Sequence, residues 1–92
     1  MYKIEFTTRM KRNVKQMEKR GKNMTKLLDV LKLLEEGNSL PANYRDHALA
    51  GKLKGFRECH IEPDWLLMYI VHENVLVIAA TATGSHADML GM

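Results

Sequence analysis

The sequence predicts an α+β domain with the element order β-α-α-β-β-β, in which a helical hairpin packs on a mostly antiparallel sheet. Two observations support this class. Between residues 8 and 36, apolar residues recur at the spacing of amphipathic helices. From residue 52 onward, the segments are rich in β-branched and aromatic residues, which favours strands. A chain of 92 residues buries one modest core, so we expect a single domain over residues 1–92.

A strand and two helices are expected in the first half of the chain. The alternating segment YKIEF predicts a strand over residues 2–6. Thr7 or Thr8 can then cap a helix that continues to about residue 20 and ends at Gly21. Asn23 can cap a second helix that continues to about residue 36. The apolar positions of these helices predict part of the core: Met10, Val14, Met17, Leu27, Leu28, Leu31 and Leu34.

Three strands and a final helical turn are expected in the second half. The segments KLKGFRECHI, WLLMYIVH and NVLVIAATAT are separated by EPD and HEN, which are typical of hairpin turns. Alternation along GFRECHI places Glu58 and His60 on the more polar face, with Arg57 and Cys59 on the opposite face. The closing segment GSHADML predicts a helical turn with a capping box between its serine and its aspartate.

Positive charge is concentrated at the N-terminal end. Residues 1–26 carry nine basic and two acidic side chains, a net charge of +7, whereas the rest carry five basic and nine acidic side chains, a net charge of −4. A cationic surface of this density attracts a polyanion such as RNA, and it is equally compatible with an ordinary solvated helix face. The candidate contacts to RNA or the ribosome are Lys11, Arg12, Lys15, Lys19, Arg20 and Lys22.

Cysteine content and hydropathy predict a cytoplasmic protein. The single cysteine, Cys59, has no partner for an internal disulfide, which favours a reducing compartment. The N-terminal segment MYKIEFTTRMKR has no apolar region of the signal-peptide kind, and no apolar run approaches the ~20 residues of a membrane span. We therefore expect no membrane association.

Three histidines and one aspartate fall at positions where the predicted strands begin or end. His47 ends a loop, His60 lies on the polar face of a strand, Asp64 opens the next strand, and His86 follows the last one. If the strands pair as hairpins, Asp64 lies close to His60. Imidazoles beside a carboxylate suit acid–base catalysis near neutral pH, and the same set could bind zinc. The chain contains no HExxH motif, no cysteine pair and no His-x-His chelate, which makes a metal site the weaker interpretation.

Two motifs carry a resemblance to a known family. The run YRDHALAGKLKGFRECHIEPDWLLMY and the later TGSHADML resemble the YafQ-type toxins of bacterial type II toxin–antitoxin pairs, within the RelE superfamily. The resemblance covers essentially the whole chain. It implies a microbial-RNase-type fold and a ribosome-dependent endoribonuclease that cleaves mRNA without metal or cofactor. It also implies a cognate antitoxin similar to DinJ or RelB, and operator DNA as a partner through the antitoxin complex.

The resemblance also implies roles for single residues. The catalytic positions of the family fall on His47, His60, Asp64 and His86. We expect His60, held by Asp64, to act as the base, His86 as the acid and His47 on the phosphate side, although the proton roles could be exchanged. The substrate surface is expected to include Trp65, Lys54, Arg57 and Leu90.

Two positions depart from the family pattern. A basic residue often precedes the TG[ST]H motif, where this chain has Ala82, and the family often ends in an aromatic residue where this chain has Leu90. A lost cation would weaken stabilisation of the transition state, unless Arg57 or Lys54 replaces it. The alternative function is therefore a weak or inactive member of the fold that binds an antitoxin or RNA.

Overall fold

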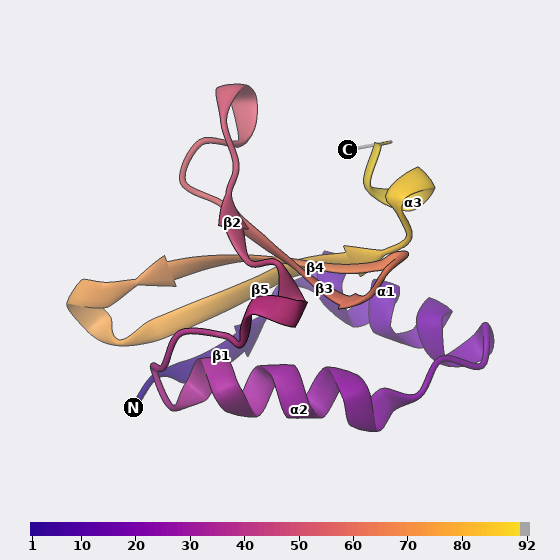
Figure 1. Ribbon diagram of the computed structural model, residues 1–92, viewed down its shortest axis with the longest axis horizontal. Coiled ribbons are helices and arrows are strands. Elements are labelled where there is room, and N and C mark those ends of the chain that lie inside the picture. Colours follow the sequence, from indigo (N-terminus) through magenta and orange to yellow (C-terminus); the bar gives the residue numbers. More distant parts are fainter. Residues whose placement is uncertain (91–92) are drawn as a thin grey trace.

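The computed structural model describes residues 1–90 and contains a five-stranded sheet in the order β1-β5-β4-β3-β2 (Figure 1). β1 is parallel to β5, and the other neighbouring strands are antiparallel. The predicted α+β class and mostly antiparallel sheet are therefore confirmed. The strands are β1 Lys3–Phe6, β2 His47–Ala48, β3 Arg57–Glu62, β4 Trp65–His72 and β5 Val77–Gly84.

Two long helices, α1 (Thr8–Lys19) and α2 (Met24–Glu35), lie on the same side of the sheet, below it in Figure 1. Thr7 is the N-cap of α1, because its hydroxyl accepts a hydrogen bond from a first-turn amide. Asn23 caps α2 in the same way. Gly21 separates the helices with a φ of +82°, which a residue with a Cβ rarely adopts. No helix within residues 1–90 is long and apolar enough to cross a membrane.

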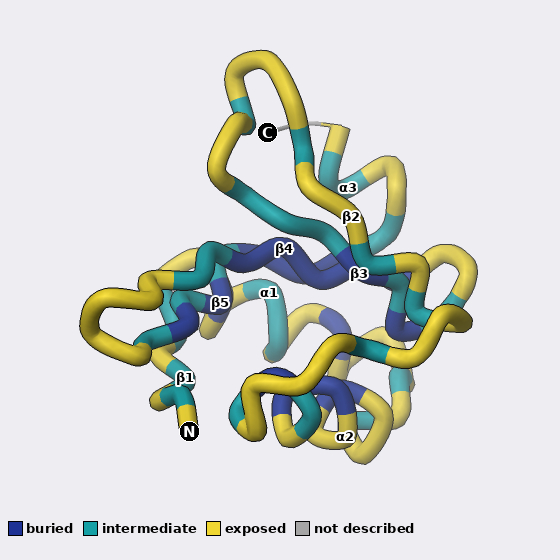
Figure 2. Tube along the Cα trace, turned by 60° about the vertical axis from the view of Figure 1, so that its left-hand side comes forward, coloured by how far each residue is buried: buried dark blue, intermediate teal, exposed yellow. Residues whose placement is uncertain are grey.

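The hydrophobic core fills the layer between these helices and the sheet. Figure 2 shows that β4 and the inner faces of α1 and α2 are the most buried parts of the chain. The sheet contributes Cys59, Ile61, Trp65, Leu67, Tyr69, Ile78 and Ala80. The helices contribute Met10, Met17, Leu27, Val30, Leu31 and Leu34, which confirms most of the predicted core. Leu28 differs from the prediction, because 62% of its surface is exposed.

Two segments rise from the opposite face of the sheet: the loop that contains β2, and α3 (His86–Leu90) (Figure 1). The sequence predicted a continuous strand from residue 52, but β3 begins only at Arg57. Gly51 and Gly55 interrupt the extended backbone with φ values of +65° and +99°. β2 lies in a segment predicted to be loop and pairs with the start of β3. These raised segments carry His47, in β2, and His86, at the start of α3.

Candidate active site

Strand pairing brings three histidines together above the sheet. His47 in β2 pairs with Glu58, which lies two residues before His60 in β3. His60 is opposite a β4 residue whose other partner is Gly84, two residues before His86. The ring centroids of His47 and His60 are 6.2 Å apart, and those of His60 and His86 are 5.8 Å apart. The expected grouping of imidazoles is therefore present, with His60 in the middle.

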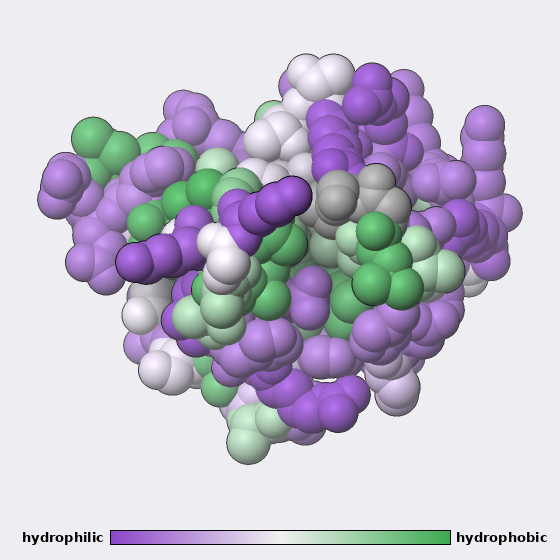
Figure 3. All heavy atoms as spheres, turned by 90° about the horizontal axis from the view of Figure 1, so that it is seen from above, coloured by the Kyte–Doolittle hydropathy of each residue, from purple (hydrophilic) through white to green (hydrophobic). Residues whose placement is uncertain are grey.

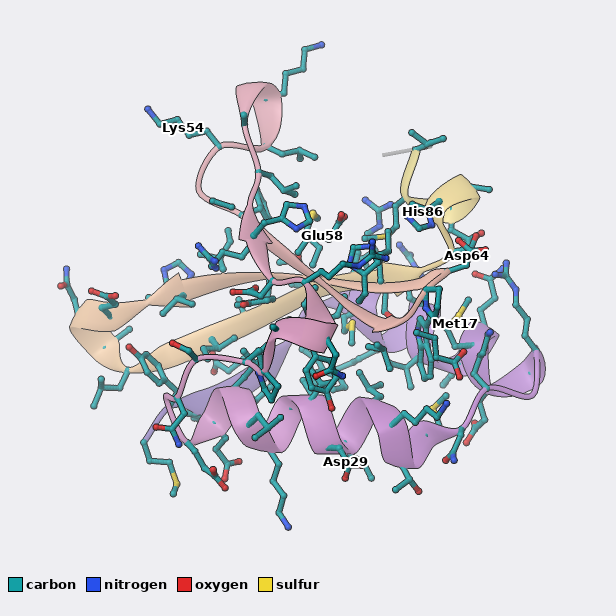
Figure 4. The ribbon with its side chains drawn as sticks, in the orientation of Figure 1. Met17, Asp29, Lys54, Glu58, Asp64 and His86 are labelled. Atoms are coloured by element: carbon teal, nitrogen blue, oxygen red, sulfur yellow. The ribbon has the colours of Figure 1, made fainter. Side chains whose placement is uncertain are left out.

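Asp64 binds His86. One carboxylate oxygen of Asp64 lies 2.6 Å from Nδ1 of His86 and accepts a hydrogen bond of 2.8 Å from the backbone N–H of the same residue (Figure 4). The expected pairing of Asp64 with His60 is wrong, because α3 folds back over the β3–β4 turn and places His86 against the carboxylate. Hydrogen bonds from the His86 backbone and side chain lower the pKa of Asp64. An ionised carboxylate holds the His86 ring with Nδ1 as the donor, and Nε2 forms no hydrogen bond within residues 1–90.

His60 is partly buried. Its Nδ1 is buried and has no hydrogen-bond partner among the described residues. Burial lowers the pKa of His60, and the nearby positive charge of Arg45 lowers it further, against an opposing effect of Glu58. The lowered pKa favours the neutral ring, which is the form that accepts a proton.

His47 is oriented by the backbone. Its Nδ1 lies 2.8 Å from the carbonyl oxygen of Arg45, which can only accept, so Nδ1 carries the hydrogen. Its Nε2 lies 3.7 Å from a carboxylate oxygen of Glu58. Figure 4 shows Glu58 above the sheet on the side of His86. Glu58 was missing from the predicted site, although alternation had placed it on the same face as His60.

A capping network fixes α3 and therefore His86. The Asp88 carboxylate accepts hydrogen bonds from the backbone N–H and hydroxyl of Ser85, at 2.8 and 3.0 Å, and the Asp88 N–H donates to that hydroxyl. The predicted capping box is therefore confirmed. Arg20 donates two hydrogen bonds of 2.6 and 3.1 Å to the same carboxylate. The ion pair with Arg20 is the main reason that the pKa of Asp88 is well below its usual range.

The predicted substrate contacts need two corrections. Trp65 is fully buried among the core residues, so it is not part of the open surface. Arg57 lies on the helix-facing side of β3, where its Nη2 donates a 2.8 Å hydrogen bond to Asp46, and it does not join the histidines. Lys54 lies on the raised loop with its side chain directed away from Glu58 and His86 (Figure 4). Leu90, at the end of α3, is 85% exposed.

Ala82 lies on the face of the histidines. It pairs with Met68 in β4, whose other neighbour is Glu58. Its side chain is fully buried, so this position offers a substrate neither charge nor hydrogen bonds. Seen from above, hydrophilic side chains cover most of this face, and smaller groups of hydrophobic side chains lie between them (Figure 3).

The predicted RNA-binding cations fall into two groups. Arg20 binds Asp88, and Lys22 binds Glu62 together with Lys26, at 3.0 and 2.7 Å from the two carboxylate oxygens. These ion pairs neutralise part of the predicted positive patch. The remaining cations are exposed on α1 and form no ion pair within residues 1–90: Lys11, Arg12, Lys15 and Lys19.

The fold and the site define the class of protein. The structure is similar to a metal-bound toxin from Helicobacter pylori, with a TM-score of 0.90 and 34% identity over 97% of this chain and 99% of that one. Within residues 1–90, no group of three or more histidine, cysteine, aspartate and glutamate side chains is arranged to hold a metal ion. The chain therefore has the fold of a small bacterial toxin.

Residues 2–91 match the family described as bacterial toxin of type II toxin-antitoxin system, YafQ, and the chain belongs to that family. The mRNA interferase toxin YafQ of Escherichia coli K12 is 40% identical over 89 residues, which cover 96% of this chain and 95% of that protein. The toxin in the E. coli DinJ-YafQ complex has a TM-score of 0.89 and 37% identity over 99% of this chain and 100% of that one. The resemblance inferred from the two motifs is confirmed.

Proposed function

We propose that this toxin is an endoribonuclease that cleaves mRNA by histidine acid–base catalysis, without metal or cofactor. The single observation that carries the proposal is that His60, which is partly buried and has a lowered pKa, lies beside a His86 ring held by Asp64. One ring is then suited to take a proton and the other to give one. The name of the E. coli relative, an mRNA interferase toxin, supports the same activity.

The proposed reaction is a transesterification within the RNA chain. His60 takes the proton of a 2′-hydroxyl, and the 2′-oxygen attacks the adjacent phosphorus. The bond from phosphorus to the 5′-oxygen breaks, and His86 gives that oxygen its proton. The products are a 2′,3′-cyclic phosphate and a 5′-hydroxyl. His47, held by the Arg45 carbonyl, faces the phosphate from the other side of His60.

The proposed partners follow from the family. E. coli YafQ has been solved in complex with DinJ, and we propose a DinJ-like antitoxin as the partner that inhibits this chain in the cytoplasm. We also propose that the antitoxin complex binds operator DNA. The proposed substrate is mRNA on the ribosome, because a domain of 92 residues with an open site gains substrate orientation from a larger surface.

Incubation with translating ribosomes is expected to yield mRNA cuts at defined positions, with little cutting of free RNA. The measurement is primer extension on the same message with and without ribosomes. Equal cleavage of both substrates would contradict ribosome dependence. Complete absence of cleavage would favour the alternative function, a module that binds without cutting, for which the uncharged Ala82 is the supporting observation.

A strong chelator should leave the rate unchanged, and a loss that zinc restores would contradict the metal-free mechanism.

Charge reversal on α1 is expected to weaken ribosome binding. The double variant Lys11→Glu, Lys15→Glu changes two exposed cations that form no ion pair within residues 1–90. Each lost phosphate contact reduces the slope of log affinity against log salt concentration by about one. Sedimentation with ribosomes at several salt concentrations measures both effects. The matched control is the double variant Glu5→Lys, Glu18→Lys, which adds positive charge in the same region. Unchanged salt dependence in the Lys11→Glu, Lys15→Glu variant would identify α1 as a solvated face.

A further inference from the structure

The site needs a cation that Ala82 does not supply. Cleavage places extra negative charge on the phosphate oxygens, and a positive side chain stabilises that charge. The Arg57 guanidinium is bound to Asp46 on the opposite face of the sheet. Arg20 is bound to Asp88, and Lys22 and Lys26 are bound to Glu62 at the end of β3. None of these cations is free to face His60.

Arg45 is the cation beside the histidines. It lines, together with His60, a pocket of about 360 Å³ whose other lining residues include Glu62. Its carbonyl oxygen accepts a hydrogen bond from Nδ1 of His47. Arg45 therefore lies next to two of the three histidines, His47 and His60. Arg45 is exposed and forms no ion pair within residues 1–90. Its guanidinium is therefore available to an anion that enters this pocket.

The backbone at Arg45 is held in an uncommon conformation. Its φ of 48° and ψ of 44° lie in the left-handed region, which non-glycine residues adopt rarely and at an energetic cost. The next residue, Asp46, is fixed from the helix side of the sheet, where its carboxylate accepts hydrogen bonds from Arg57 and from the Tyr69 hydroxyl. These bonds anchor Asp46, the residue between Arg45 and His47.

We propose that Arg45 binds the scissile phosphate of the RNA, in place of the basic residue that the family often has at the position of Ala82, and that Asp46 positions it. This inference rests on the proposed nuclease function. Arginine suits the role because its planar fork donates two parallel hydrogen bonds to a phosphate. The proposed site then contains a base, His60, an acid, His86, and a phosphate-binding cation, Arg45.

The charge of Arg45 also acts on the base. Burial lowers the pKa of His60 most, the positive charge of Arg45 lowers it further, and Glu58 opposes this effect. Removal of the guanidinium therefore raises the pKa of His60. The acid limb of the pH–rate profile, where the base becomes protonated, then moves to higher pH.

The first experiment is kinetic. Arg45→Gln removes the charge and keeps a shorter, polar side chain, and kcat for ribosome-bound mRNA is expected to fall by ~10²–10³-fold. Arg45→Lys should retain part of the activity, because it keeps the charge without the fork. Lys52→Gln, an exposed cation on the same raised loop, is the matched control and should match the wild type. Equal melting temperatures show that the variants are folded.

A second experiment is independent of cleavage. Adenosine 3′-monophosphate is titrated into the wild type and the variants while the histidine ring signals are followed by NMR. Arg45→Gln is expected to weaken binding at least tenfold and to raise the pKa of His60, and Lys52→Gln should do neither. Unchanged nucleotide affinity in folded Arg45→Gln would overturn the proposal, even if the wild type proved inactive. Failure of the wild type to cleave, with affinity still dependent on Arg45, would overturn only the nuclease function.

Discussion

His86→Ala is expected to lower mRNA cleavage by ~10²–10⁴-fold with little change in ribosome affinity, because a general acid acts only in the transition state. His60→Ala should cause a similar loss by removing the base. Cleavage of ribosome-bound message under single-turnover conditions measures both. His72→Ala is the matched control, since His72 lies exposed at the far end of β4 and should leave the rate unchanged.

Two further comparisons separate this mechanism from general damage to the site. The double variant of His60 and His86 should lose much less than the product of the two single losses, because residues that act as a unit are not additive. Asp64→Asn should cost less than His86→Ala, since its contact orients the ring and takes no proton.

Because the pKa of His60 is lowered, wild-type activity should persist below the ordinary pKa of histidine and decline at more acidic pH. Full activity in both single histidine variants would contradict the mechanism.

Local patterns were sufficient for much of the fold and for part of the site. Alternation of side chains correctly separated His60 from Cys59, because one-sided burial fixes which face of a strand is apolar. The same alternation placed Arg57 opposite His60, and this should have removed it from the predicted substrate surface. Spacing in the helices identified their core positions because the period of a helix is a local property.

The remaining features depend on contacts between distant segments. The bond between Asp64 and His86 joins residues separated by 22 positions and requires α3 to fold over the β3–β4 turn. β2 is only two residues long and exists because β3 offers it a partner, so no strand pattern marks it. The sequence pattern therefore does not distinguish Arg45 from other basic residues in loops. Its place beside His60 follows from that short pairing and from the anchoring of Asp46.

Trp65→Ala is expected to destabilise the protein by about 3–5 kcal/mol, because it removes the largest fully buried side chain of the core and leaves a cavity. The structure places Trp65 under the sheet, where Nε1 donates a 2.9 Å hydrogen bond to the Thr83 hydroxyl, which in turn donates to a β4 carbonyl at 2.6 Å. Trp65→Phe keeps most of the ring volume and loses that bond, so its cost should be only about 1–2 kcal/mol. Urea denaturation measures both values.

The two variants also distinguish a core role from a substrate-binding role. If Trp65 acts only through the core, Trp65→Phe should lower the melting temperature by roughly 4–16 °C, since about 1 kcal/mol corresponds to 4–8 °C in a domain of this size. Its kcat at temperatures where it is fully folded should equal that of the wild type. A folded Trp65→Phe variant with normal stability and a reduced kcat would show that the indole contacts the substrate, and the buried position would then have to open during catalysis.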